Sequence, residues 1–242
     1  MKAALAIILL AGAHATAVAQ GFTPADKDKD DAWKRCRAND PDVRIEACRV
    51  LIDSGPDSSA DLASAYYSRG TAYRQKGRFG DAVDDFNAAI NANPSLIDAY
   101  GERGITFTIL GRFNDAIPDF THVIEAYPRL AYPYYNRGLC YELIGLEDLA
   151  IEDITKSIEI EPRADFRYER RGTIYFRKKL IDRALADYEQ ALVINPQYAP
   201  ALYARGIVKM KKGDLAGGGA DIAAARYIRE TIDIEMSRAG VK

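Results

Sequence analysis

The apolar residues of this chain recur at helical spacing in five successive blocks of equal length. Each block contains a related phrase, which reads in turn YYSRG, YGERG, YYNRG, YERRG and LYARG. The glycines that end these phrases are 34 residues apart, at Gly70, Gly104, Gly138, Gly172 and Gly206. A fixed period of this size indicates a solenoid of stacked supersecondary units.

Each block predicts two helices that pack closely against each other. With the glycine numbered 8, positions 4, 8 and 11 share one face of the first helix. Large residues predominate at positions 4, 11 and 24, and small ones at positions 8 and 20, so the helices can approach closely at the small residues. A glycine at position 15 is placed to end the first helix, and a proline at position 32 ends the second. The fourth block has Lys179 at position 15, and we expect it to turn by other means.

This pattern resembles the tetratricopeptide repeat (TPR), whose signature runs aromatic, Gly, aromatic, Ala, aromatic, Pro over 34 residues. The resemblance covers residues 63 to about 230. It implies an all-α fold, a right-handed α-solenoid of about five helix-turn-helix units. The units are 63–96, 97–130, 131–164, 165–198 and 199–230.

The fifth unit departs from the pattern and predicts an end to the solenoid. It has Lys209 at position 11, Gly218 at position 20 and no proline at position 32. Its second helix is expected to be longer and more polar than the others, which suits a C-terminal capping helix. Residues 231–242 would form the C-terminal cap or tail. We interpret the GGGAD run at 217–221 as close helix packing rather than a phosphate loop.

Residues 20–62 predict a helical hairpin that caps the other end of the solenoid. An Asp-Pro pair at 40–41 is a good helix start. Cys36 and Cys48 would lie on facing sides of the two helices, and the absence of a CxxC spacing favours a structural disulfide over redox or metal chemistry. The third cysteine, Cys140, occupies a helix position where the other units carry small or apolar residues, which predicts a buried free thiol.

Charged residues repeat with the same period as the glycines. Position 7 is arginine in every unit and position 23 is aspartate in every unit. The two series are Arg69, Arg103, Arg137, Arg171 and Arg205, and Asp85, Asp119, Asp153, Asp187 and Asp221. Buried charges require partners, so we predict a structural ion ladder between packed helices, either within a unit or between neighbours. An arginine row that binds phosphate or sulphate is the alternative, but the aspartates would neutralise it.

Composition and the first residues bear on localisation and partners. The chain has 242 residues and a formal net charge of -2, which gives no reason to expect nucleic acid as a partner. Residues 1–19 predict a signal peptide, with Lys2 as a basic start, a short apolar run and an Ala-Val-Ala cleavage site that ends at Ala19. We therefore expect a periplasmic or secreted protein that is not inserted in the membrane after signal removal.

The sequence offers no set of residues for catalysis. There are only two histidines, and one of them lies in the leader. We find no phosphate loop, no nucleophile–base pair and no metal-ligand cluster in the sequence. We therefore predict a protein that is not an enzyme and that needs no cofactor or metal.

The resemblance to TPR proteins implies a concave groove lined by positions 2, 5, 9, 12 and 13 of the first helices. In this chain those positions form an apolar and aromatic stripe. The candidate groove residues are Tyr67, Arg74, Ile105, Tyr132, Tyr135, Leu139, Leu143, Phe166, Phe176 and Tyr203. Such a patch marks an interaction site, although the same spacing would fit residues packed in the core or against the chain's own ends.

The predicted function is that of a non-enzymatic exported scaffold that binds a protein or peptide partner in the concave groove. Position 9 has no asparagine, so the clamp that some TPR proteins use for acidic C-terminal tails is not expected, and an apolar peptide fits better. One alternative is a self-assembling homo-oligomer. Another is a small-molecule carrier, which would need a closed pocket with convergent polar groups.

Overall fold

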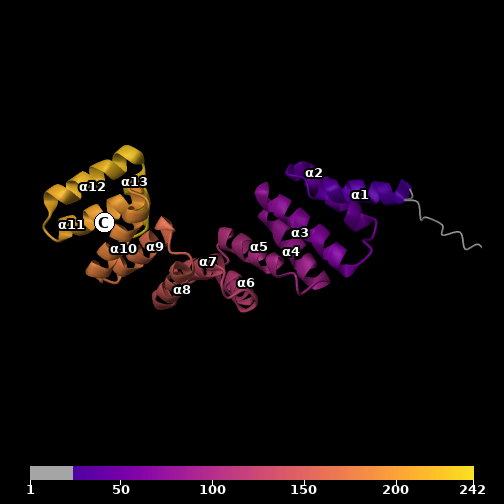
Figure 1. The fold of residues 1–242 in the computed structure, drawn as a ribbon, viewed down its shortest axis with the longest axis horizontal. Helices are drawn as coiled ribbons and strands as arrows, with labels where there is room; N and C mark the ends of the chain where they lie inside the picture. The colour runs from indigo at the N-terminus through magenta and orange to yellow at the C-terminus, as the bar shows by residue number, and fades with distance from the viewer. Residues whose placement is uncertain (1–23) are drawn as a thin grey trace, which may run out of the picture.

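The computed structural model describes residues 24–242, and the predicted signal peptide at 1–19 lies outside this range. Thirteen helices and no strand make up the described residues. They are α1 (Pro24–Cys36), α2 (Pro41–Asp53), α3 (Ser59–Gln75), α4 (Phe79–Ala92), α5 (Ile97–Ile109), α6 (Phe113–Ala126), α7 (Ala131–Leu143), α8 (Glu147–Ile160), α9 (Asp165–Arg177), α10 (Ile181–Ile194), α11 (Ala199–Lys211), α12 (Leu215–Ile228) and α13 (Ile232–Arg238). Successive pairs stack along the long axis of the molecule (Figure 1).

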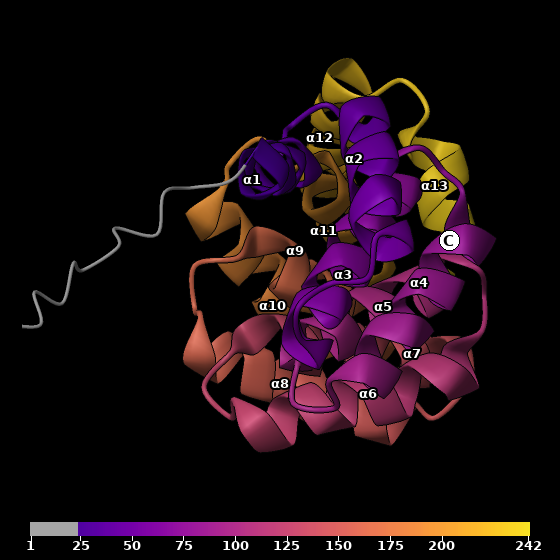
Figure 2. The same ribbon diagram turned by 90° about the vertical axis from the view of Figure 1, so that its right-hand side faces the viewer.

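The stacked pairs form a right-handed α-solenoid, as the repeat pattern predicts. The pairs from α3–α4 to α11–α12 carry the five predicted units, and each helix packs mainly on its partner and on the next helix along the chain. In a view along the long axis, the helices are arranged around a ring (Figure 2). The first helices of successive units touch one another in addition, which is how a solenoid acquires an inner face.

The glycine at position 8 is where the two helices of a unit come closest. A Cβ atom added to Gly172 would lie 2.9 Å from a ring carbon of Tyr188 and 3.1 Å from the Cβ of Asp187. The approach is closer still in the last unit, where a Cβ on Gly206 would lie 2.8 Å from the backbone oxygen of Gly218. The glycine run at 217–221 lies in α12, which packs tightly on α11. This confirms the interpretation of the run as a site of close helix packing.

The turn between the helices of a unit uses a residue in the left-handed region. Gly145 and its counterparts at position 15 have φ between 72° and 93°. Lys179 adopts the same conformation, with φ of 61°. The expectation that the fourth unit turns by other means is therefore wrong, because the lysine accepts the conformation that glycine adopts without strain.

The N-terminal hairpin continues the solenoid. Cys36 and Cys48 form a buried disulfide with their Cα atoms 4.8 Å apart, as predicted. Asp40 caps the start of α2, also as predicted. Helix α2 packs on α3, and Arg44 Nη1 donates to the hydroxyl of Thr71 at 3.1 Å. Because α1 also touches α3, the hairpin takes the place of a shortened repeat in front of the first unit.

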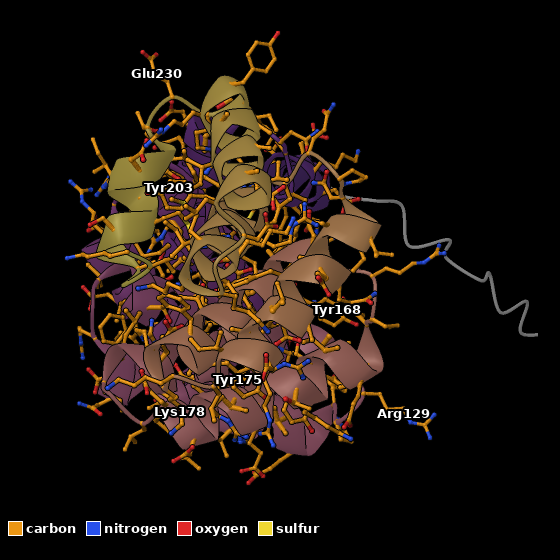
Figure 3. The ribbon with its side chains drawn as sticks, turned by 90° about the vertical axis from the view of Figure 1, so that its left-hand side faces the viewer. Arg129, Tyr168, Tyr175, Lys178, Tyr203 and Glu230 are labelled. Carbon is orange, nitrogen blue, oxygen red and sulfur yellow. A yellow bond between two sulfur atoms is a disulfide. The ribbon has the colours of Figure 1, made fainter. Side chains whose placement is uncertain are left out.

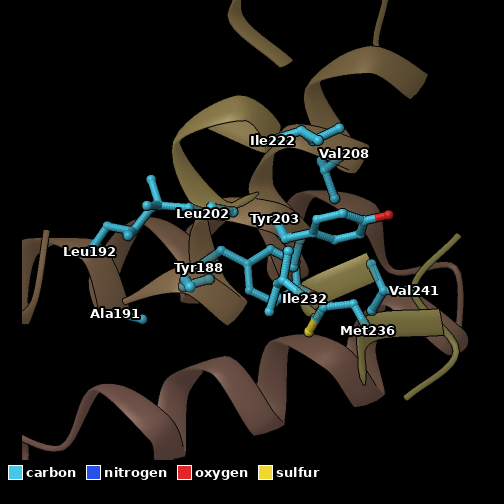
Figure 4. Packing of buried hydrophobic residues seen from close by; sticks show 14 of the residues in the cluster. Tyr188, Ala191, Leu192, Leu202, Tyr203, Val208, Ile222, Ile232, Met236 and Val241 are labelled. Atoms are coloured by element: carbon cyan, nitrogen blue, oxygen red, sulfur yellow. The ribbon is translucent and has the colours of Figure 1, made fainter. Parts of the chain in front are cut away.

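The C-terminal end differs from the sequence prediction. Helix α12 has 14 residues, as do the second helices of the other units, so the expectation of a longer helix is wrong. The chain turns after α12, and α13 folds back against α11. Its buried Ile232 and Met236, followed by Val241, join a core cluster with Tyr203 of α11 (Figure 4). The C-terminal cap is therefore a separate helix on the side of α11.

Candidate functional site on the concave face

The repeated arginines and aspartates form pairs within each unit. Nε of the arginine donates to Oδ2 and Nη2 donates to Oδ1 of the aspartate sixteen residues further on, over 2.7–2.9 Å. The pairs are Arg69–Asp85, Arg103–Asp119, Arg137–Asp153, Arg171–Asp187 and Arg205–Asp221. This two-bond geometry is the one in which guanidinium and carboxylate match best.

Three of the arginines also bond to the preceding unit, a contact that the sequence analysis missed. Nη1 of Arg137 donates to the hydroxyl of Thr121 at 3.0 Å, and Arg171 donates to Thr155 at 2.9 Å. Arg103 reaches the amide oxygen of Asn87 at 2.6 Å. The corresponding feature of the sequence is a polar residue at position 25 of each of the first three units, the units that accept these bonds. The guanidinium groups are thus engaged inside the protein, which disfavours an anion site.

The charge balance of the pairs differs along the ladder. Burial raises the pKa of Asp85 above its ordinary value, because one arginine offsets the loss of solvation only in part. Burial would also raise the pKa of Asp221, but Arg205 and Lys209 together lower it below its ordinary value. The Nζ atom of Lys209 lies 2.9 Å from Oδ2 of Asp221. The lysine that breaks the repeat pattern therefore serves as a second cation for this carboxylate.

The C-terminal part of the predicted groove is covered by the chain itself. Phe176 is 9% exposed and Tyr203 is 8% exposed, because both pack in the cluster that includes α13. Figure 3 shows Tyr203 close to the ribbon of α13. Nη1 of Arg177 donates to the backbone oxygen of Ala239 at 3.3 Å and to Glu142 at 2.8 Å. These groove candidates therefore bind the tail of their own chain.

The middle of the groove is a half-covered aromatic and charged cluster. Tyr135 and Phe166 meet edge to face, with ring centroids 5.0 Å apart. Glu169 is buried and accepts a hydrogen bond from the hydroxyl of Thr173 at 2.8 Å. Burial raises the pKa of Glu169, although Arg170 and Thr173 act in the opposite direction. Tyr135 is half-buried here, whereas Phe166 is 38% exposed.

The N-terminal part of the groove is open. A cleft of about 310 Å³ lies between α3, α5 and α7, and two predicted groove tyrosines lie in its wall. Its lining residues are Tyr67, Asp98, Gly101, Glu102, Ile105 and Tyr132. Arg74 pairs with Glu102 at 2.8 Å on one side of it. Beyond the cleft, Leu139 is half-buried and Leu143 is 57% exposed.

Three lining residues of the cleft were not among the candidates from the sequence. Asp98 and Glu102 lie on α5, and Gly101 between them occupies position 5, where the other units carry tyrosine or glutamate. The one feature of the sequence that marked the cleft was this glycine at a position where the other units carry a large side chain. It had no obvious meaning in the sequence, because the cleft depends on tyrosines from the units on either side.

Other chemistry is not evident in the described residues. No group of histidine, cysteine, aspartate and glutamate side chains within residues 24–242 is placed to hold a metal ion. Cys140 is a buried free thiol, as predicted, and burial raises its pKa. None of the described helices is long and apolar enough to cross a membrane.

Paired helices stacked around a concave face define a helical repeat scaffold. Family models of the tetratricopeptide repeat match the chain at residues 63–96, 131–163 and 172–213. The chain therefore contains tetratricopeptide repeats in these segments. No curated protein sequence matches it.

Solved structures with the same fold include MamA and YrrB. A crystal structure of MamA is 23% identical with a TM-score of 0.62, over 68% of this chain and 96% of that chain. A MamA structure from Desulfovibrio magneticus RS-1 has a TM-score of 0.65 at 18% identity, over 72% of this chain and 96% of that chain. YrrB, described as a TPR protein with an unusual peptide-binding site, has a TM-score of 0.63 at 15% identity, over 80% of this chain and 99% of that chain.

Proposed function

We propose that this protein is a non-enzymatic, exported scaffold that binds a protein or peptide partner along the open part of its concave face. The observation that carries the proposal is the uncovered apolar stripe on α3, α5 and α7, with a cleft at one end and Leu139 and Leu143 at the other. Exposed apolar surface on a concave scaffold marks an interaction site. YrrB, of similar fold, is described by its peptide-binding site, which agrees with this use of the fold.

The covered part of the groove limits where the partner lies. Phe176 and Tyr203 are buried in the cluster that includes α13, so we place the partner on the first three units. The available stripe favours an extended or helical peptide with apolar side chains.

Site-specific photo-crosslinking from position 143 tests the proposal in the protein's own host. The matched control is position 149, because Leu149 is an exposed leucine on the second helix of the same unit. We expect one dominant foreign protein from position 143 and none from position 149. The captured protein, once identified and purified, should bind the protein directly and lose that binding when Ile105 in the cleft is replaced by arginine.

Two results would contradict the proposed function. Adducts of the protein with itself alone would favour a self-assembling oligomer. The absence of any adduct would leave the stripe without an interaction role.

Export rests on the predicted signal peptide and on the Cys36–Cys48 disulfide, which is characteristic of oxidising compartments. Amino-terminal sequencing of the protein recovered from its host tests this part separately. A mature chain that begins at Gln20 and lies outside the cytoplasm is expected. An uncleaved chain in the cytoplasm would contradict it.

A further inference from the structure

The cleft between α3, α5 and α7 has a shape that the other units do not repeat. Position 5 carries a large side chain in the other four units and glycine in this one. A Cβ on Gly101 would lie 2.6 Å from the hydroxyl oxygen of Tyr132. Because Gly101 has no side chain, this tyrosine reaches down onto α5, and a space remains between it and Tyr67. The result is a cleft with one tyrosine from each neighbouring unit in its wall.

Two carboxylates, those of Asp98 and Glu102, line the cleft. Asp98 is exposed and forms no ion pair with any residue in the described part of the chain. Glu102 accepts from Arg74 through Oε2 only, at 2.8 Å, so its other oxygen is available. None of the six residues that line the cleft carries a positive charge. The neighbouring cation, Arg74, thus balances one of the two carboxylates.

The two carboxylates raise the pKa values of both tyrosines in the cleft. The pKa of Tyr67 is raised to about 12, mainly by burial and further by Glu102 and Asp98. Burial, Asp98 and Glu102 also raise the pKa of Tyr132. Two carboxylates close to both phenols make the cleft a poor place for an anion, and an apolar side chain would remove water from Asp98 without offering it a partner.

We propose that this cleft binds the cationic side chain, lysine or arginine, of the partner peptide, an inference that rests on the proposed function. The carboxylate of Asp98 supplies the counter-charge, and the two tyrosine rings flank the aliphatic part and the cationic head of the side chain. The chemistry that selects the ligand is therefore charge complementarity combined with aromatic walls.

The surface next to the cleft suggests which residue accompanies the cation. Asp98 also borders a hollow of about 550 Å³ that contains the exposed apolar side chains of Tyr127 and Leu130. Arg129 lies at the rim of this hollow and forms no ion pair with Asp98 in the described structure. A partner with an apolar residue close to its lysine or arginine would fill both sites.

A titration with a single residue analogue tests the cleft without knowledge of the partner. The probes are N-acetyl-lysine N-methylamide and its norleucine analogue, which has a neutral side chain of similar length. Both are added to the ¹⁵N-labelled full chain while the backbone amide of Gly101 is followed by NMR. We expect the lysine probe to shift this amide with an affinity about five times that of the norleucine probe.

Two matched pairs of variants locate the effect. Asp98→Asn should reduce the affinity for the lysine probe about fivefold, whereas Asp84→Asn, at another exposed aspartate on α4, should not change it. Gly101→Ala should abolish the shift because its methyl group displaces Tyr132, whereas Gly80→Ala adds a methyl group in open space. Circular dichroism confirms that each variant is folded.

The outcomes separate this inference from the proposed function. Equal affinity of the two probes, or an Asp98→Asn variant that binds as well as the parent, would overturn the cation site. Small shifts spread over all acidic surfaces would do the same. If the cation site were overturned in this way but the crosslinking experiment identified a partner on the stripe, the proposed scaffold function would still be supported.

Discussion

At the scale of single residues, each arginine of the ladder joins the two helices of its unit through two hydrogen bonds to one aspartate. Arg137 bonds to Asp153 on the second helix of its own unit and to Thr121 on the preceding unit. The repeat of arginine and aspartate made this ladder predictable from the sequence, because charges at inward positions must be paired. The bonds to position 25 were not predictable in the same way, because threonine and asparagine at a helix surface have many possible roles.

Replacement of Arg137 by leucine should destabilise the protein by about 3–5 kcal/mol, because it leaves the buried carboxylate of Asp153 without its counter-charge. Urea unfolding followed by circular dichroism measures the loss. The control is Arg112→Leu, which breaks an exposed pair with Asp115 and should cost less than about 1 kcal/mol. Equal effects of the two substitutions would show that the ladder does not stabilise the fold.

At the scale of elements, the packing of two helices in a unit depends on how close their backbones can come. Sequence reasoning predicted the helix pairs and their close contact, because glycine recurs at one position over five units. It failed at the second helix of the fifth unit, where a segment rich in glycine and alanine gave no sign of the turn after Ile228. That turn depends on where Ile232 and Met236 find apolar partners, which the local pattern does not contain.

Gly172→Ala should destabilise the protein by about 1–3 kcal/mol, because the added methyl group would lie 2.9 Å from the buried ring of Tyr188. Gly80→Ala is the matched control. Its methyl group meets no atom within 4 Å inside α4, so the variant should gain up to about 1 kcal/mol from the better helix propensity of alanine. Thermal unfolding of both variants checks the pair, and a stabilising Gly172→Ala would contradict the packing argument.

The last unit should be the first to open in acid. A lowered pKa means that Asp221 contributes stability above its ordinary pKa of 3.8, and this contribution disappears as the pH falls from about 3.8 through the lowered value. Asp85 has a raised pKa, so the folded state takes up its proton more readily than the unfolded state, and acid does not remove stability there. Hydrogen exchange near pH 3 should therefore show α11 and α12 open before α3 and α4. If α3 and α4 opened first, the opposite pKa shifts of Asp221 and Asp85 would not determine the order of opening in acid.

At the scale of the whole molecule, the solenoid has one open and one closed stretch of concave face. The repeat pattern predicts an inner face lined by the first helices of the units. It could not predict which stretch is free, because the answer depends on a cluster in which Phe176 and Tyr203 pack with a tail that begins at Ile232, 29 residues after Tyr203. The cleft at Gly101 was hidden for the same reason, since three successive units form it.

The docking of the tail should depend on its inward residues alone. Ile232→Ala removes a fully buried side chain of α13 and should destabilise the protein by about 2–5 kcal/mol. Ile234→Ala, at a side chain that is 57% exposed on the same helix, should have almost no effect. Differential scanning calorimetry compares the two. If both substitutions were harmless, α13 would not be a stable part of the concave face.

The tail also changes how the units depend on one another. In a linear array, cooperativity passes only between neighbours, so the weakest junction decides whether the array melts as one unit or as two. The five units meet at four junctions, and an arginine bonds across each of the first three. At the fourth junction, the described structure has no hydrogen bond from Arg205 to Glu189 of the preceding unit. There Arg177 of the fourth unit bonds to Ala239, while α13 packs on the fifth. The C-terminal segment thus adds a link between the last two units, beside the packing of α10 on α11 and the Lys212–Asp182 ion pair, and its loss would weaken that junction.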